Sequence, residues 1–221
     1  MIMQTKYKVL IVDDHPIVRE GLTQLINRQK DLEVGAEAEE VSDALKILAK
    51  RKIDLVITDL AFQGMNGLDL IKSIKSRWPK LPVLVFSMHD ESLYAERALH
   101  AGAGGYLMKG ESNSKMITAI RRVLSGEVYV SEKITEKILT QMTGKIQNPG
   151  TVWESLSNRE LEVFDLLGRG LGTRQIADRL CLSIKTINTY REHLKEKLGL
   201  NNAVELTQKA IHWVQSKPPA P

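Results

Sequence analysis

Five short apolar runs, separated by segments of helical period, constrain the fold of the first 125 residues more than any other feature. Short runs rich in β-branched residues read as strands, and strands that alternate with helices favour a parallel sheet covered on both faces. The predicted strands are Lys8–Val12, Glu33–Ala38, Leu55–Thr58, Val83–Ser87 and Gly105–Met108. We therefore predict an α/β domain with a doubly wound, five-stranded parallel sheet of flavodoxin-like order 2-1-3-4-5.

Helical segments lie between these strands and continue after them. Apolar residues recur at helical spacing in Ile17–Ile26, Ala44–Lys50, Leu68–Trp78, Leu93–Ala101 and Met116–Leu124. After Gly126 the strand signals end, and Glu132–Met142 is predicted to be a short helix. The segment Thr143–Thr151 gathers Gly, Asn, Pro and Thr, which is typical of a linker.

The chain of 221 residues therefore divides into two domains. We expect an α/β domain over residues 1–126, a helical linker over 127–152 and an all-α domain over 153–216. The tail, residues 217–221, contains three prolines and is expected to be disordered.

Composition favours a cytoplasmic protein. Cys181 is the single cysteine, so the chain has no internal disulfide framework and fits a reducing compartment. No run of apolar residues is long enough for a signal peptide core or a membrane span. The net charge is +4, and residues 174–197 hold six basic and three acidic residues. Such a basic stripe suggests a polyanion as partner, although on a helical surface it is more often just a solvated face.

Acidic residues follow two neighbouring strands of the predicted sheet. The motif "VDDH" places Asp13 and Asp14 after the first strand, and "ITDL" places Asp59 after the third. An aspartate here could simply cap the next helix, which has Pro16 in its first turn, but one would suffice. Three carboxylates at one sheet edge repel each other unless a cation compensates, and Mg²⁺ prefers oxygen ligands. We predict a Mg²⁺ site formed by these three residues.

A hydroxyl and a lysine are expected at the same edge, because Ser87 ends the fourth strand and Lys109 follows the fifth. Taken singly, Ser87 could be a turn former and Lys109 a surface lysine. Together with the carboxylates they form a site for phosphoryl transfer to Asp59, the predicted nucleophile, with Lys109 and the metal neutralising charge on the transferred group.

Residues 7–125 resemble the receiver domain of bacterial two-component response regulators. The matching motifs are "VDDH", "ITDL", "GMNG", "FSMHD" and "AGAGGYLMKG". The resemblance implies that Asp59 accepts phosphate from a histidine kinase and that Ser87 and Lys109 sense it. Tyr106 stands at the position of the aromatic switch residue, although a half-buried strand tyrosine is an equally good interpretation.

Three positions, at two sites, depart from the receiver pattern. Receivers often have Met-Pro three and four positions after the acceptor aspartate, where this chain has Phe62 and Gln63, although Gly64 and Gly67 are retained. Many receivers also have a cis proline after the strand-five lysine, and here Gly110 follows. The departures bear on the loop shape and on the placement of Lys109, and neither removes a chemical group.

The second domain contains two helices joined by a short turn, a pattern that is typical of a helix-turn-helix, although any helical hairpin can look this way. Ser157 and Glu160 fit a capping box at the start of its first helix, and the glycines at 168, 170 and 172 end that helix. Thr173 is expected to cap a second helix, Arg174–Leu180. Ser183 is expected to cap a third helix that extends to Leu198.

The third helix of this domain has a predicted core face and a predicted polar face. Ile184, Ile187, Leu194 and Leu198 are expected to face the core. Polar residues on the leading turns can contact base edges, and basic residues at the margins suit phosphates. The predicted DNA-binding residues are Arg174, Lys185, Thr186, Asn188, Thr189, Arg191 and Lys195.

Residues 156–214 resemble the LuxR-type four-helix DNA-binding domain, through "LSNRELEV", "TRQIADRLCLSIKTI" and "LKEKLGL". Tyr190 stands where histidine is common, and Glu192 stands where several relatives have a polar or basic residue, which could shift the preferred DNA sequence. The last helix, Ala203–Val214, resembles the helix through which such domains pair. Leu206, Ile211 and Trp213 are candidates for that interface, although packing in the domain's own core is the better account of at least one.

A receiver joined to a LuxR-type domain is the architecture of the NarL/FixJ class of response regulators. The resemblance implies a phosphorylation-dependent transcription regulator, not a metabolic enzyme, whose partners are a sensor histidine kinase, promoter DNA and a second copy of itself. RNA polymerase is a further candidate partner. Three alternatives are a phosphate-independent regulator, an adaptor with a receiver-like domain, and an aspartyl phosphohydrolase. Phosphohydrolases of that kind have a DxD motif at the first strand, and "VDDH" does not match it.

Overall fold

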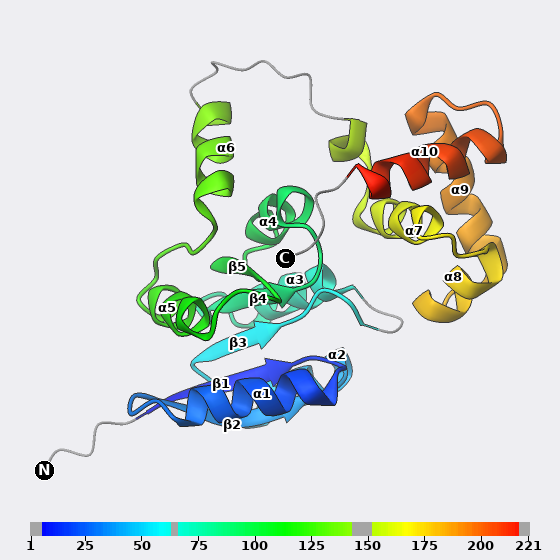
Figure 1. Ribbon diagram of the computed structural model, residues 1–221. Coiled ribbons are helices and arrows are strands. Elements are labelled where there is room, and N and C mark those ends of the chain that lie inside the picture. Colours follow the sequence, from blue (N-terminus) through cyan, green and yellow to red (C-terminus); the bar gives the residue numbers. More distant parts are fainter. Residues whose placement is uncertain (1–5, 63–65, 143–151, 217–221) are drawn as a thin grey trace, which may run out of the picture. The chain divides into compact units, whose positions relative to one another are not determined.

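The computed structural model describes residues 6–62, 66–142 and 152–216, which form two compact units, residues 1–146 and 147–221 (Figure 1). In these described ranges no helix is long and apolar enough to cross a lipid bilayer.

The first unit confirms the predicted sheet. Its five strands are all parallel and lie in the order β2-β1-β3-β4-β5, with helices on both faces (Figure 1). The strands are β1 (Tyr7–Val12), β2 (Leu32–Ala38), β3 (Leu55–Thr58), β4 (Val83–Ser87) and β5 (Gly105–Met108). The helices are α1 (Pro16–Asn27), α2 (Val41–Lys50), α3 (Gly67–Arg77), α4 (Glu91–His100), α5 (Asn113–Leu124) and α6 (Glu132–Met142).

Buried apolar side chains on both faces of the sheet hold the helices against it. Val9 and Ile11 of β1 point to one face, where they pack with residues of α1 and α5 such as Leu22 and Ile120. Successive residues of a strand alternate between faces, and Leu10 is also fully buried, so both faces of β1 are covered. This explains why β1 reads as a continuous apolar run.

Several helices begin earlier than their apolar periodicity predicts, because polar residues cap them. The side chain of Asp90 accepts a hydrogen bond from Ser92 N, so α4 starts at Glu91 instead of Leu93. Ser112 similarly precedes α5, which starts three residues before the predicted Met116. Capping depends on polar residues that carry no hydrophobic periodicity.

The segment after α5 adds to the open edge of the sheet, which the sequence did not predict. Tyr129 N donates to the Gly104 carbonyl (3.0 Å), and Tyr106 N donates to the Tyr129 carbonyl (2.7 Å). Helix α6 then packs on α4 through the buried side chain of Ile134 and through an ion pair of 3.1 Å between Lys137 and Glu96. Residues 127–142 of the expected linker thus belong to the first compact unit.

The second unit is a helical bundle around α7. Its elements are the 3-10 helix η1 (Val152–Ser155), α7 (Asn158–Gly168), α8 (Thr173–Leu180), α9 (Ile184–Leu198) and α10 (Ala203–Gln215). Residues 160–167 of α7 are all buried, and Trp153, Phe164 and Trp213 form an aromatic cluster with ring centroids 5.1–5.5 Å apart. A side chain at Gly168 would overlap the Ala210 carbonyl, so this glycine permits the close approach of α7 and α10.

The helix starts in this unit largely follow the predicted caps. Ser157 and Glu160 form the predicted capping box, and Ser183 Oγ accepts a hydrogen bond from Thr186 N (3.0 Å). One predicted cap is wrong: α8 begins at Thr173 itself, after the N-cap Gly172, whose N–H donates to the Gln175 side chain (2.9 Å). The predicted linker residues 143–151 and the tail 217–221 lie outside the described residues.

Candidate functional site

The carboxyl ends of β1, β3, β4 and β5 bring the predicted acidic and basic residues together. Because Val12 pairs with Thr58, the residues that follow, Asp13 and Asp59, are neighbours at the sheet edge. Both side chains are almost fully buried, whereas Asp14 is partly exposed. The predicted convergence of these carboxylates is therefore present in the structure.

Lys109 joins the two buried carboxylates. Its Nζ atom lies 2.6 Å from Asp13 Oδ2 and 2.6 Å from Asp59 Oδ2, and its side chain is only 9% exposed. Burial alone would lower the pKa of Lys109, but the carboxylates of Asp59 and Asp13 outweigh it and hold that pKa above its ordinary value. The lysine is therefore charged at neutral pH and compensates charge that would otherwise be buried without a partner.

Ser87 connects Asp59 to Tyr106 of β5 through hydrogen bonds. Ser87 Oγ donates to Asp59 Oδ1 (2.6 Å) and accepts a hydrogen bond from His89 N (3.3 Å). The His89 carbonyl accepts a hydrogen bond from the hydroxyl of Tyr106 (2.7 Å). Burial raises the pKa of Tyr106 well above its ordinary value, so the phenol keeps the proton that it donates. Tyr106 is fully buried, not half-buried.

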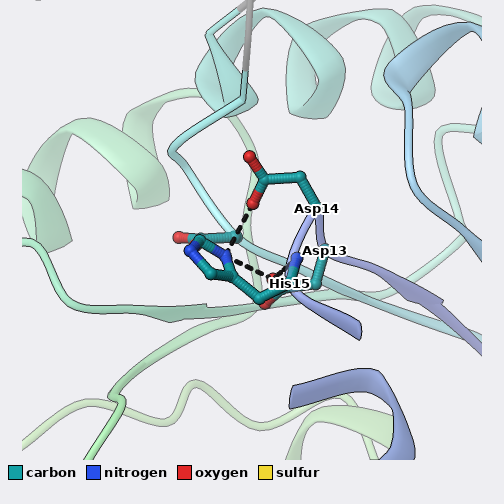
Figure 2. A group of neighbouring side chains, drawn as sticks. Asp13, Asp14 and His15 are labelled. Carbon is teal, nitrogen blue, oxygen red and sulfur yellow. Dashed lines mark hydrogen bonds and ion pairs between the residues drawn. The ribbon is translucent and has the colours of Figure 1, made fainter. Parts of the chain in front are cut away.

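The donor set of this pocket fits a hard divalent cation such as Mg²⁺. Oxygen atoms of Asp13, Asp14 and Asp59 and a ring nitrogen of His15 all lie within 4.8 Å of one another. Asp14 Oδ1 is buried and accepts no well-aligned hydrogen bond from any described residue, although His15 Nδ1 lies 2.7 Å away (Figure 2). A carboxylate oxygen left in this way is available to a metal ion. Sequence reasoning missed His15, whose only signal is its adjacency to the two aspartates.

Neither aspartate caps α1, so the simpler interpretation of "VDDH" is wrong. The N-cap residue is His15, which makes no side-chain capping bond. Asp13 Oδ1 accepts a hydrogen bond from His15 N (2.9 Å), within the turn that precedes the helix. The two adjacent charges are therefore not explained by helix capping.

The two departures from the receiver pattern leave the pocket assembled. Phe62 is buried, while Gln63 and Gly64 lie outside the described residues. Gly67 has no room for a Cβ atom, which would overlap the backbone of Asp59 and Leu60, so this glycine lets α3 start directly against the acceptor strand. Gly110 has φ +124°, which proline cannot adopt, yet Lys109 still reaches both carboxylates.

Four of the seven predicted DNA-binding residues are exposed to solvent, three of them on helix α9. Lys185, Asn188 and Thr189 are exposed, as is Arg174 on α8. On the opposite face Ile187, Leu194 and Leu198 are buried, as predicted. Ile184 is instead 44% exposed, because it is the first residue of α9 and lies beyond the core.

The side chains of the other three predicted DNA-binding residues already interact with neighbours in the second unit. Thr186 Oγ1 lies 2.7 Å from Ser183 Oγ at the cap of α9. Arg191 donates to Thr173 Oγ1 (2.6 Å), which joins α9 to the start of α8. Lys195 forms an ion pair of 2.7 Å with Glu192. These contacts orient the side chains at the margin of the polar face.

The candidates for pairing on α10 differ in exposure. Leu206 is fully buried and Trp213 is 8% exposed, so both pack in the core of the unit, and Ile211 is half-buried. Val204, which was not predicted, is 64% exposed and lies seven residues before Ile211 on the same helix face. Val204 and Ile211 therefore both contribute apolar surface to the accessible side of α10.

Two family profiles match the chain. The profile described as "Response regulator receiver domain" matches residues 9–121, and that described as "Bacterial regulatory proteins, luxR family" matches residues 154–210. These ranges contain the acidic pocket and the helices α7 to α9, respectively.

Relatives match nearly the whole chain. The oxygen regulatory protein NreC of Staphylococcus epidermidis is 32% identical over 92% of this chain and 96% of its own. The response regulator GacA of Pseudomonas aeruginosa is 34% identical, over 92% and 95%. A solved structure of RcsB from Salmonella enterica, bound to the promoter rprA in the presence of the phosphomimetic BeF3-, covers 94% of this chain and 99% of its own, with a TM-score of 0.65 and 26% identity.

Proposed function

The chain belongs to the NarL/FixJ class of two-component response regulators, and we propose that Asp59 accepts a phosphoryl group from a sensor histidine kinase. The phosphoryl group shifts the chain toward a dimer, and this dimer binds promoter DNA. One observation carries the proposal. Lys109, Ser87 and the carboxylate of Asp13 converge on Asp59 at a single buried pocket.

In the proposed reaction an oxygen of Asp59 attacks the phosphorus atom, the P–N bond of a phosphohistidine breaks, and the imidazole leaves with its electron pair. Mg²⁺ held by Asp13, Asp14 and Asp59 would supply neutralisation of charge on the transferred group. Lys109 and Ser87 now donate to the carboxylate of Asp59 at 2.6 Å, and after transfer they can donate to phosphoryl oxygens instead.

The contacts of Ser87 give this change a route to the surface. Movement of Ser87 perturbs its bond with His89, whose carbonyl is held by Tyr106. Tyr106 in turn is paired with Tyr129, and α6 follows that segment. A phosphoryl group on Asp59 can therefore change the α4–β5 surface and the linker segment packed on it, since it interacts differently with the two arrangements.

The second unit is proposed to bind the DNA. Lys185, Thr186, Asn188 and Thr189 are assigned to base edges, and Arg174, Arg191 and Lys195 to phosphates. The exposure of one polar face of α9 supports these roles. RcsB bound to promoter DNA is a precedent in a relative, and dimers of RcsB bound to DNA are another. In this chain we propose that α10 contributes to pairing, with Ile211 and Val204 at the contact.

The phosphoryl acceptor is tested by intact-mass measurement of the full chain after incubation with acetyl phosphate and Mg²⁺. We expect the native chain to gain the mass of one phosphoryl group and Asp59→Asn to gain none. Asp69→Asn is the matched control, because Asp69 is an exposed aspartate on α3. A native chain that gains no mass favours the phosphate-independent regulator instead, and equal labelling of Asp59→Asn refutes the assignment of the acceptor.

A further inference from the structure

Arg19 on α1 contacts the turn that carries the acidic pair, although it is not part of any motif discussed above. Its side chain is 15% exposed, and its Nη1 atom donates to the main-chain carbonyl of Asp13 (2.6 Å). Its Nε atom lies 3.7 Å from Glu37 Oε2, and its Nη2 atom lies 3.7 Å from Glu39 Oε2. One guanidinium therefore joins α1, the turn after β1 and the end of β2.

The peptide groups of Asp13 are fixed from two sides. Asp13 N donates to the Ala38 carbonyl on β2 (3.1 Å), and the Asp13 carbonyl accepts from Arg19. With the backbone held, the Asp13 carboxylate faces Lys109 and His15 N. Asp14, the next residue, is positioned by the same turn (Figure 2). A planar guanidinium with several donors suits such a three-way contact better than an ammonium group does.

We propose that Arg19 is a positioning residue for the cation site: by holding the Asp13 carbonyl it places the carboxylates of Asp13 and Asp14 for a divalent metal ion. This inference rests on the proposed function, in which the pocket binds Mg²⁺. Arg19 touches neither the metal nor the phosphoryl group in this account. Groups that hold metal ligands from outside commonly change metal affinity by about 10–100-fold when they are replaced.

The charge of Arg19 acts in the opposite direction to its positioning role. A cation close to an acidic pocket repels Mg²⁺, and Arg19 also offsets the charges of Glu37 and Glu39. If charge were its only effect, removing it would strengthen metal binding. If it positions the turn, removing it weakens metal binding. Arg19→Lys keeps the charge and loses the planar fork, so it isolates the positioning effect.

The test measures metal binding in the full-length chain in two ways. Mn²⁺ binding followed by electron paramagnetic resonance gives the dissociation constant without any phosphoryl transfer. The Mg²⁺ dependence of phosphorylation by acetyl phosphate gives the half-saturating Mg²⁺ concentration and, separately, the limiting rate. The variants are Arg19→Lys and Arg19→Met. Thr23→Val is the matched control, because it removes the hydrogen bond of 2.8 Å between Thr23 and Glu37 in the same network without touching the turn.

We expect both Arg19 variants to raise the Mn²⁺ dissociation constant and the half-saturating Mg²⁺ concentration about tenfold. The limiting rate of phosphorylation at saturating Mg²⁺ should stay nearly unchanged in both. Thr23→Val should give the same values as the native chain. Unchanged or tighter metal binding in Arg19→Lys overturns the inference, as does an equal loss in Thr23→Val. Native Mn²⁺ binding without phosphoryl transfer would refute the proposed function while leaving the role of Arg19 measurable. A native chain that binds no metal overturns both.

Discussion

Removal of the Lys109 charge is expected to destabilise the first unit more than removal of any exposed lysine. Lys109→Met deletes a cation that lies 2.6 Å from each of two carboxylates whose side chains are only 3% exposed. Breaking a buried ion pair from one side typically costs about 3–5 kcal/mol. For a domain of this size roughly 2–4 °C per kcal/mol applies, so the melting temperature should fall by about 6–20 °C.

The assay is differential scanning calorimetry of the full chain in the presence of a chelator, so that no divalent ion replaces the lysine. Lys115→Met is the control, because Lys115 forms an exposed ion pair with Glu111 at 2.8 Å, and solvent screens such a pair so that it adds little stability. Asp59→Asn combined with Lys109→Met should recover part of the loss, since one unpaired carboxylate is then gone. A melting temperature that falls no further in Lys109→Met than in Lys115→Met would show that the buried lysine does not stabilise the first unit.

Three further predictions concern the second unit. Arg174→Ala should reduce the slope of log affinity against log salt concentration on a random-sequence duplex by about 0.9, because one phosphate contact is lost. Asn188→Ala should leave that slope unchanged. Fluorescence anisotropy measures both slopes, and an unaltered slope in Arg174→Ala contradicts its phosphate contact. Ser183→Ala should cost about 1 kcal/mol in urea unfolding because α9 loses its N-cap, with a loss near zero arguing against the cap. Burial alone would raise the pKa of Glu160, but Lys197 and Ser157 together outweigh it and hold that pKa below its ordinary 4.5. Ionised Glu160 therefore stabilises the fold above that pH, and the free energy of unfolding should drop as the pH falls below it. Glu160→Gln should flatten this drop. Unfolding of the second unit is followed by the fluorescence of Trp153 and Trp213, with Trp78 of the first unit replaced by Phe. An equally steep drop in Glu160→Gln would contradict the assignment of the pH dependence to Glu160.

Strands were the part of the fold that the sequence predicted best. The bounds of β3, β4 and β5 agree with the predicted runs, because a strand buried on both faces is a continuous apolar segment ended by a polar residue. The same logic located Asp13, Asp59 and Lys109, since the residue that follows a parallel strand must lie at the ligand-binding edge. Pattern and topology together were enough for this pocket.

Features that leave no pattern in the sequence could not be predicted in this way. The bond from Arg19 to the Asp13 carbonyl involves a backbone acceptor, which every residue has and no motif marks. The pairing of Tyr129 with Tyr106, and the ion pair of Lys137 with Glu96, join segments whose proximity follows only from the folded sheet edge. Ile184 was placed in the core because periodicity alone does not show where the core ends.

Phosphorylation of Asp59 is proposed to drive dimerisation, and light scattering coupled to gel filtration measures this change in mass. The full chain has a mass of 24.8 kDa. After incubation with acetyl phosphate and Mg²⁺, with phosphorylation verified by intact mass, we expect the native chain to shift toward twice this mass and Asp59→Asn to remain at the monomer mass. A phosphorylated native chain that stays monomeric, or an Asp59→Asn chain that dimerises equally under the same conditions, would contradict the account.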